Sequence, residues 1–452
     1  MPAVATETKL TSIQDPTVKA KIKSLCQADN WTNAWYLLRT WVYLIAVVGG
    51  TMYLFVRISD GGHPWWWNIP IALVAIILVG AGQHQLTGLA HEASHSTLFR
   101  NKKVNDLASD FLCMFPMFST THHYRLQHIA HHQFTNDPER DPDVSQLKTS
   151  GHWLPFPLLK KEFVRTVLKQ LWVPTLIRYM RIRAMYNAVG TDKNPYLRTN
   201  SRPTPKVAVR TAIFYLLGLV VALGLMTAFA PWPVLVAVPI LAGVVIVVFY
   251  WRLPDNYYKA SRVRSVFTPR QMTMMRMAFF TLFFSAIAWA TRFTGRPIYA
   301  WMFLLWVVPI FTSFSFFMVL RQLVQHGNAD RGWLTNTRTF FVNPLIRFAV
   351  FPMGQDFHLP HHMYASVPHF KLKELHETLM GTEEYCAEAT VVEGYFFPPV
   401  QPPRNPTVLD IVGPEYAGHK DEIHLDHTVL ESVEVEDKEE LLALGSGNPK
   451  SG

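Results

Sequence analysis

The chain has 452 residues, of which 49% are apolar and 17% are charged, and its formal net charge at pH 7 is +9. Because the apolar residues gather in long blocks, the composition excludes a pair of ordinary soluble domains and favours one membrane-embedded core. The positive charge lies beside these blocks, which favours contact with anionic lipid headgroups over nucleic-acid binding.

The N-terminal segment, residues 1–35, is polar and lacks the pattern of a cleavable signal peptide. Six later stretches are long and apolar enough, or nearly so, to cross a bilayer, which takes about 20 residues. They comprise residues 36–56, 69–90, 209–230, 234–251, 277–293 and 300–320. Short turns join the third to the fourth and the fifth to the sixth, so each pair predicts a hairpin. Since the third and fourth also fit a shallow hairpin, we predict an all-α integral membrane protein with four to six transmembrane helices.

Loop charge predicts the orientation of these spans. The connections after the second, fourth and sixth stretches are rich in Lys and Arg, whereas the opposite loops carry little charge and the first contains three consecutive tryptophans. Positive charge marks cytoplasmic loops, and Trp favours the membrane interface. We therefore expect both termini and the long loops to lie in the cytoplasm.

Two segments outside the spans have distinct patterns. Within residues 147–186, basic residues recur every four positions at Lys161, Arg165 and Lys169. This predicts an amphipathic helix on the cytoplasmic membrane surface, with a helix packed on a soluble cap as the alternative. Residues 401–452 begin with prolines and turn acidic, which predicts a disordered accessory tail. The intervening residues 36–400 would form one membrane domain.

Nine of the 19 histidines fall into four clusters. The first is HEASH, the second and third share the pattern HxxHH, and the fourth is a single histidine just after the sixth span. In chain order they are His91 and His95; His128, His131 and His132; His326; and His358, His361 and His362. Spacings of three and four residues place side chains on one face of a helix.

Topology places all four clusters on the same side of the membrane, so that they are able to share one site. Neutral imidazole suits transition metals such as iron, copper and zinc. Nine ligands exceed the four of a structural zinc site, which indicates two metal ions held in a cytoplasmic helical cap. The remaining histidines near the clusters, His84, His122, His123, His369 and His376, are interpreted as supporting or structural.

The cluster order resembles that of the membrane fatty-acid desaturase and hydroxylase superfamily, the histidine-box di-iron enzymes. The similarity covers residues 88–143 and 321–377 and includes HHQFTNDPERDPD, RQLVQHG and HHMYASVPHFKLKELHE. It implies that the nine histidines bind two iron ions, with O2 as co-substrate. The sequence contains neither a haem-binding HPGG motif nor an iron–sulfur cysteine run. The resemblance therefore implies a separate electron donor of the ferredoxin or cytochrome b5 type.

Ligating histidines need hydrogen-bond partners for their second ring nitrogen. The polar residues beside the clusters are candidates, with loop capping as the alternative for the carboxylates. They are Glu92, Asp137, Asp141, Asp143, Gln325 and Asp356. Gln325 departs from the family pattern, because many relatives have Glu before the lone histidine.

The resemblance implies a desaturase that introduces a double bond into a fatty acyl chain or related lipid. A hydroxylase or ketolase of a lipid or carotenoid remains the alternative, because metal ligands do not separate these reactions. A histidine-rich metal transporter or sensor is disfavoured. Transporters place ionisable groups inside their spans, and residues 216–228 and 235–248 contain none.

Overall fold

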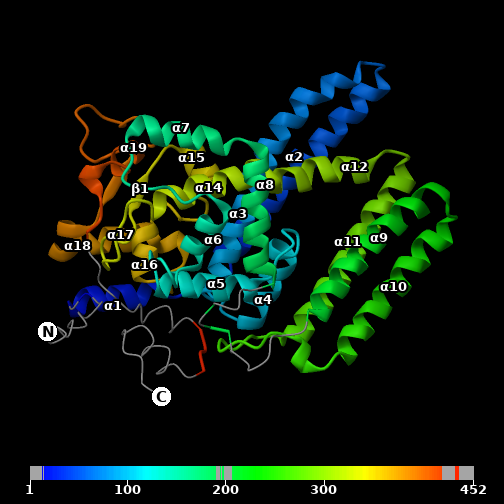
Figure 1. Ribbon diagram of the computed structural model, residues 1–452, viewed down its shortest axis with the longest axis horizontal. Coiled ribbons are helices and arrows are strands. Elements are labelled where there is room, and N and C mark those ends of the chain that lie inside the picture. The colour runs from blue at the N-terminus through cyan, green and yellow to red at the C-terminus, as the bar shows by residue number, and fades with distance from the viewer. Residues whose placement is uncertain are drawn as a thin grey trace.

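The computed structural model describes residues 13, 15–189, 194, 196–197, 206–419 and 433–436, and helices dominate this part of the chain (Figure 1). The α-helices are α1 Pro16–Leu25, α2 Thr32–Asp60, α3 Asn68–Ser94, α4 Lys102–Ser109, α5 Thr121–Gln133, α6 Pro142–Ser150, α7 Lys160–Gln170, α8 Val173–Ala184, α9 Val207–Phe229, α10 Trp232–Arg252, α11 Pro269–Thr294, α12 Ile298–Met302, α13 Val308–Phe311, α14 Ser313–Gln325, α15 Pro344–Ala349, α16 His358–Met363, α17 Leu372–Leu379, α18 Glu383–Glu388 and α19 Val408–Ile411. Two short strands, β1 Thr339–Phe341 and β2 Val391–Glu393, pair in parallel.

Six helical segments of the described chain are long and apolar enough to cross a membrane. They are Thr32–Asp60, Trp65–Ser94, Val207–Phe229, Trp232–Arg252, Pro269–Thr294 and Ile298–Gln325. The third and fourth have 23 and 21 residues, enough for each to span about 30 Å of hydrocarbon. The prediction of an all-α, multi-pass membrane protein is confirmed, and these six segments are its candidate spans.

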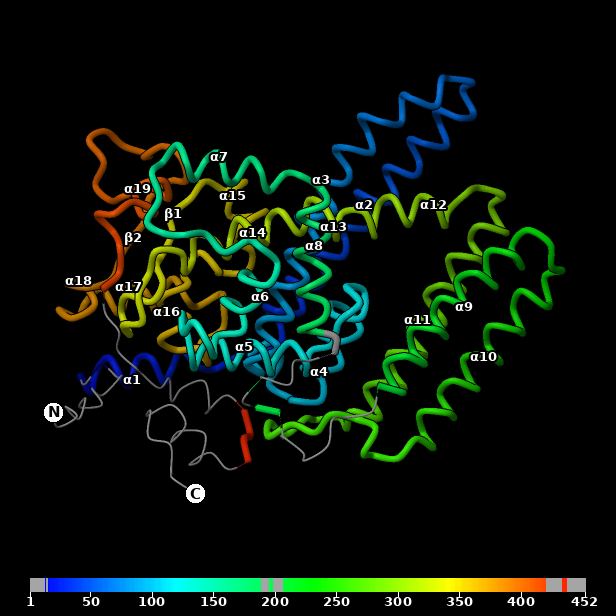
Figure 2. The backbone as a smooth tube through the Cα atoms, viewed as in Figure 1, coloured from blue at the N-terminus to red at the C-terminus, as the bar shows by residue number. Residues whose placement is uncertain are grey.

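The spans form two arms that meet a compact cap of short helices. One arm is the α2–α3 hairpin, and the other contains α9, α10 and α11, which pack on one another. The sixth span runs from the second arm towards the cap as α12, a π-helical turn at Phe303–Val307, α13 and α14. Figure 2 shows α1, α16 and α17 in the cap, away from the arm of α9, α10 and α11.

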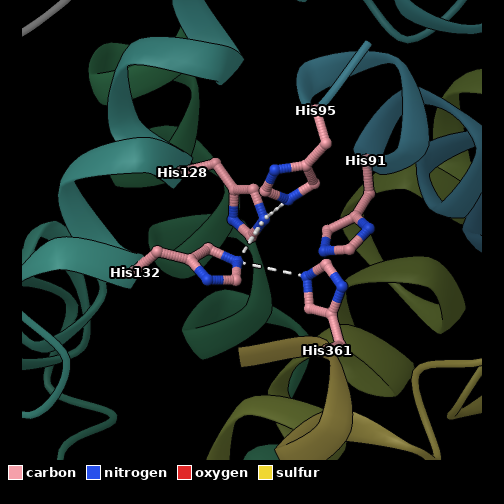
Figure 3. Close-up of side chains that lie close together, drawn as sticks. All are labelled: His91, His95, His128, His132 and His361. Atoms are coloured by element: carbon pink, nitrogen blue, oxygen red, sulfur yellow. Dashed lines mark hydrogen bonds between the residues drawn. The ribbon is translucent and has the colours of Figure 1, made fainter. Parts of the chain in front are cut away.

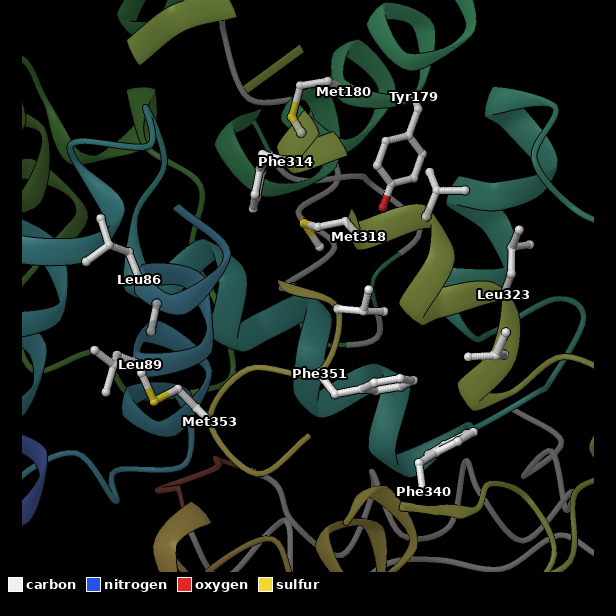
Figure 4. Packing of buried hydrophobic residues seen from close by; sticks show 14 of the residues in the cluster. Leu86, Leu89, Tyr179, Met180, Phe314, Met318, Leu323, Phe340, Phe351 and Met353 are labelled. Atoms are coloured by element: carbon white, nitrogen blue, oxygen red, sulfur yellow. The ribbon is translucent and has the colours of Figure 1, made fainter. Parts of the chain in front are cut away.

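Close packing joins α14 to α3 at the centre of the molecule. A Cβ atom at Gly80 would lie 2.7 Å from the backbone nitrogen of Phe314 and closer still to Ser313 Oγ, so the helices approach through this glycine. Apolar side chains from α3, α14 and the cap form one core (Figure 4). Within it, the rings of Phe340 and Phe351 stack with centroids 4.9 Å apart.

Three consecutive polar residues of α3 also connect this span to later parts of the chain. Gln83 Nε2 donates to the carbonyl of Trp306 over 2.8 Å, and Gln85 Nε2 donates to that of Phe348 over 2.6 Å. His84 Nδ1 lies 2.7 Å from the carbonyl oxygen of Ala349. Hydrogen bonds of this kind satisfy polar groups that the hydrocarbon core of a membrane leaves unsolvated.

The structure divides the predicted amphipathic helix of residues 147–186 into separate pieces. This segment contains the end of α6, followed by α7 and α8. Prolines separate these helices: residues 155 and 157 follow α6, and Pro174 opens α8. Within α7 the amphipathic pattern holds: Phe163 and Val167 are buried, while the basic residues face outward. The prediction of one continuous helix is therefore wrong.

The predicted disordered tail also differs from the structure in its first part. Val408, Ile411 and Val412 are fully buried in the main core, and the carbonyl of Val412 accepts a hydrogen bond from Leu158 N over 2.8 Å. Residues 401–419 therefore pack with the membrane domain, since apolar side chains outweigh the preceding prolines. Residues 433–436 pair with the backbone of residues 262–264. The remainder of the predicted tail lies outside the described residues.

Candidate metal centre

A buried arginine holds α5 against the end of α3. Arg125 makes two hydrogen bonds of 3.0 and 2.6 Å to the carboxylate of Asp106. Its other N–H groups donate to the carbonyls of Ala93 and Ser94 over 2.8 and 2.9 Å. Because these carbonyls directly precede His95, the arginine brings the histidines of α5 beside those of α3.

The start of α5 is fixed by a second carboxylate. Both the backbone nitrogen and the hydroxyl of Thr121 donate to Asp110 Oδ1 over 2.7 Å. Thr120 caps the helix by accepting from His123 N over 3.4 Å, which satisfies one of its free N–H groups. The rotation of α5 about its axis is therefore set at its first turn.

Five histidine side chains converge on one volume in the cap (Figure 3). They are His91, His95, His128, His132 and His361, and one ring nitrogen from each lies within 4.8 Å of all the others. Nε2 of His128 lies 2.9 Å from Nε2 of His95 and 3.0 Å from that of His132. The Nε2 atoms of His132 and His361 are 3.1 Å apart. Figure 3 shows these rings pointing inward from the C-terminal end of α3, from α5 and from α16.

A second group of four histidines adjoins the first. It contains His131, His326, His358 and His362, whose nitrogens satisfy the same 4.8 Å limit. Nε2 of His326 lies 3.2 Å from that of His131 and 2.9 Å from that of His358. The two groups touch where the rings of His132 and His362 stack, with centroids 4.1 Å apart.

Helix α5 contributes to both groups because of its HxxHH spacing. His128 and His132, four residues apart, face the group of five, whereas His131 faces the group of four. The third cluster divides in the same way, since His361 joins the first group and its neighbours join the second. All nine predicted histidines are thus brought together. His84, His122, His123, His369 and His376 lie outside both groups.

Hydrogen bonds to Nδ1 fix the tautomer of three histidines in the group of four. Nδ1 of His131 lies 3.0 Å from Asp141 Oδ1, and Nδ1 of His326 lies 3.1 Å from the carbonyl oxygen of Asn336. Thr135 Oγ1 donates to the carbonyl of His131 and accepts from Nδ1 of His362 over 3.3 Å. Each bond places the proton on Nδ1 and turns the lone pair of Nε2 towards the centre of the group.

Two of these partners escaped the sequence analysis. Thr135 acts on the ring of His362, 227 residues away, so no local spacing in the sequence points to it. Asn336 acts through its backbone carbonyl, for which the sequence carries no signal.

Of the six predicted supporting residues, Asp141 has a hydrogen bond to a clustered histidine. Glu92 Oε1 lies 3.6 Å from Nδ1 of His91. The other oxygen of Glu92 accepts from Thr97 Oγ1 over 3.0 Å and from the backbone of His369 over 2.8 Å. Glu92 therefore connects α3 to the segment that follows α16, close to the first histidine cluster.

The other four candidates have different partners among the described residues, with no hydrogen bond or ion pair to the nine histidines. Asp137 pairs with Arg140 and Arg331, Asp143 accepts from Gln322, Gln325 donates to the carbonyl of Gln355, and Asp356 pairs with Arg347. These contacts fix the loops and helices around the centre.

Burial favours the neutral, metal-binding form of most of these imidazoles. It lowers the pKa well below the usual 6.5, and neighbouring imidazoles lower it further, at His95, His128, His132, His326, His358, His361 and His362. His131 differs. Burial alone would lower its pKa, but the carboxylates of Asp141 and Asp143 raise the pKa to about 9.

The donor set fits metal ions. Because Nδ1 of both His131 and His326 faces an acceptor, their Nε2 lone pairs point at each other across 3.2 Å. Such a contact is repulsive unless a positive charge, either a proton or a metal ion, lies between them. Nε2 of His91 and of His362 are buried and have no hydrogen-bond partner in the described structure. Imidazole nitrogens directed at a shared volume are the ligands that iron and related metals accept.

Fold and site together define a multi-pass helical membrane protein with two adjoining groups of buried histidines. Residues 64–273 and 254–392 match the model of a family described as fatty acid desaturase. Since these segments together extend over residues 64–392, well over half of the chain, the protein belongs to the fatty acid desaturase family.

Individual relatives match shorter segments. The chain is 31% identical over 124 residues to dihydrorhizobitoxine desaturase of Bradyrhizobium elkanii, which covers 27% of this chain and 32% of the relative. It is 34% identical over 110 residues to the Delta(5) fatty acid desaturase of Caenorhabditis elegans, covering 24% and 23%. Identity to the Delta 8-(E)-sphingolipid desaturase of Emericella nidulans is 28% over 98 residues, covering 22% and 16%. The matched segments thus span about a third or less of each of these relatives.

Proposed function

We propose that this protein is a membrane-bound oxygenase that uses O2 and external electrons to introduce a double bond into a fatty acyl chain or related lipid. The observation that carries the proposal is the convergence of nine buried histidines in two adjoining groups. Membership of the fatty acid desaturase family supports the reaction class. The names of two relatives, a fatty acid desaturase and a sphingolipid desaturase, support a lipid substrate.

Two iron ions are the proposed cofactors. His91, His95, His128, His132 and His361 would hold one ion, and His131, His326, His358 and His362 would hold the other. When bound, the irons would supply dioxygen activation and removal of hydrogen from an unactivated C–H bond. Asp141, Asn336 and Thr135 would keep the proton of their histidine partners on Nδ1, so that Nε2 remains available as a ligand.

The proposed topology places the cap, the active site and both termini in the cytoplasm. The basic loops support it, because they follow the second, fourth and sixth spans, on the side where the histidine clusters lie. A separate ferredoxin or cytochrome b5 type protein would deliver electrons at this cap. Residues 36–400 form the proposed membrane domain, and residues 401–419 pack against it.

Lipid profiling tests the proposed reaction. The full-length chain is expressed in a host membrane beside a His131→Ala variant, and total lipids are analysed by mass spectrometry. A His63→Ala variant serves as the matched control, because His63 is exposed and far from both groups. We expect acyl chains that have lost two hydrogens with the wild type and with His63→Ala, and none with His131→Ala.

Two other results would contradict the proposed function. A gain of one oxygen in the lipids would assign the protein to the hydroxylases and overturn the proposed double-bond formation. Iron analysis of the purified protein provides the second readout. A folded protein without bound iron would refute the assignment of the histidines as ligands.

A further inference from the structure

Two cavities meet at a charged junction beside the histidine groups. A cavity of about 50 Å³ is lined by histidines of both groups. A second cavity of about 160 Å³ has a mainly apolar lining that includes Met180, Phe314 and Met318, and Figure 4 shows these three side chains near one another. Tyr124, Arg183, Asn187 and Arg321 line both cavities.

The two arginines at this junction are buried and lack an ion-pair partner. Arg183 of α8 is 9% exposed and Arg321 of α14 is 8% exposed. Arg183 donates to Gln146 over 3.4 Å, and Arg321 donates to the side chain of Gln355. Within the described chain, no carboxylate lies within 4.0 Å of either guanidinium group, and Nε of Arg321 has no hydrogen-bond partner. Burying a charge without a counter-ion is costly, so this arrangement requires a compensating gain.

The cavity lining does not supply the missing negative charge. Its carboxylates are Asp141 and Asp143. Asp141 is held by His131, which leaves Asp143 as one carboxylate for two guanidinium groups, and Asp143 itself accepts from Gln322 over 3.1 Å. The junction therefore carries excess positive charge beside the histidine groups. A hydrocarbon chain alone would gain nothing from it.

We propose that Arg183 and Arg321 form a binding subsite for a carboxylate group of the substrate. The apolar part of that substrate would extend from the carboxylate into the cavity between α8 and α14, so the bonds next to the carboxylate would be the part of the chain nearest the histidines. The planar guanidinium fork matches a carboxylate in geometry as well as in charge. The proposal rests on the proposed function for the reaction and adds the class of substrate: an acid oxidised near its anionic end.

Binding of a carboxylate probe to the purified, iron-loaded protein tests the subsite. Octanoate and 1-octanol, which share an apolar chain and differ in charge, are titrated by calorimetry. Hydrogen bonds to charged groups predict that octanoate binds about 10- to 100-fold more tightly than octanol. Arg183→Gln and Arg321→Gln should each abolish this preference while leaving octanol affinity and iron content unchanged. Arg321→Lys should restore part of it.

Arg181→Gln provides the matched control. Arg181 lies on α8 beside Arg183 but is exposed, so the same charge is removed outside the cavities. Its octanoate affinity should equal that of the wild type. Equal binding of octanoate and octanol by the wild type, or full octanoate affinity in an iron-loaded Arg321→Gln protein, would overturn the proposal. An equal loss in Arg181→Gln would overturn it as well.

The two proposals fail separately, because this experiment measures binding and lipid profiling measures turnover. If the protein binds octanoate no more tightly than octanol while lipids still lose hydrogen, the proposed reaction stands and the proposed subsite does not. If octanoate binds through the arginines while lipids stay unchanged, the subsite stands and the proposed lipid desaturation does not.

Discussion

Replacing Asp141 by asparagine tests how the group of four histidines is held. Asp141 is 1% exposed, and its carboxylate accepts hydrogen bonds from three N–H groups. Oδ1 accepts from Nδ1 of His131 over 3.0 Å and from Asp143 N over 2.8 Å, and Oδ2 accepts from Asn136 N over 2.9 Å. An asparagine side chain has one oxygen, so in either orientation its NH2 group faces an N–H donor. The substitution therefore loses at least one buried hydrogen bond as well as the negative charge.

Both losses have magnitudes that set the expected result. A buried group left without its partner costs about 1–3 kcal/mol. Removal of a carboxylate that orients a ligating histidine typically lowers metal affinity by about 10- to 100-fold. Because Asp141 contacts His131 and no histidine of the group of five, the loss should concern one of the two proposed irons.

Iron retention measures this effect directly. Purified wild-type and Asp141→Asn proteins are dialysed against increasing chelator, and bound iron is quantified per chain. We expect the variant to lose half of its iron at about 10- to 100-fold lower chelator, with the other half unaffected. Asp137→Asn is the matched control, since Asp137 also precedes a proline and is bound by Arg140 and Arg331. Two irons retained with wild-type affinity in Asp141→Asn, or an equal loss in Asp137→Asn, would refute the reasoning.

Three further predictions concern stability in detergent. Burial raises the pKa of Asp110 from 3.8 to about 6, so the folded state binds more protons than the unfolded state between about pH 4 and 6 and loses stability as pH rises through that window. Asp110→Asn should therefore melt at a higher temperature than the wild type at pH 7.5, with no such gain at pH 4. Truncation after Pro402 removes the three buried side chains of residues 408–412, whose burial contributes about 1.5–3 kcal/mol each to the free energy of unfolding. It should abolish the monodisperse protein peak in size-exclusion chromatography, whereas truncation after His419 should preserve that peak. Gly80→Ala should destabilise the α3–α14 crossing by about 1–3 kcal/mol through contact with Ser313, and an unchanged melting temperature would argue against that packing.

The histidines could be found from the sequence because their signal is local. Spacings of three and four residues, repeated in three clusters on one side of the membrane, need no knowledge of tertiary structure. Their division into two groups could not be predicted without the tertiary structure, because His131 and His132 are adjacent in sequence and face different groups. That division depends on how Arg125 and Asp110 set the rotation of α5.

The roles of the supporting carboxylates were less predictable, because they too depend on tertiary contacts. Asp137 and Asp141 both precede a proline, and nothing local distinguishes them. Asp141 caps α6 and faces His131, whereas Asp137 faces two arginines, one of them 194 residues away. By contrast, the break between α7 and α8 and the apolar residues of the tail were visible in the sequence. For residues 147–186, the periodicity of the basic residues was given more importance than the break at Pro174. For the tail, the prolines that begin it were given more importance than the apolar residues from Val408 onward.

The polar residues of α3 have a consequence for the order of biosynthesis. Gln83, His84 and Gln85 enter the membrane 223, 265 and 263 residues ahead of the residues whose carbonyls they contact. Until then, water or an insertion chaperone has to satisfy these side chains, because hydrocarbon does not. The group of five histidines is likewise incomplete until His361 has been synthesised, after the sixth span. Assembly of the centre therefore follows membrane insertion, and the half-made chain remains dependent on its insertion machinery until the last span and residues 348–349 have docked on α3.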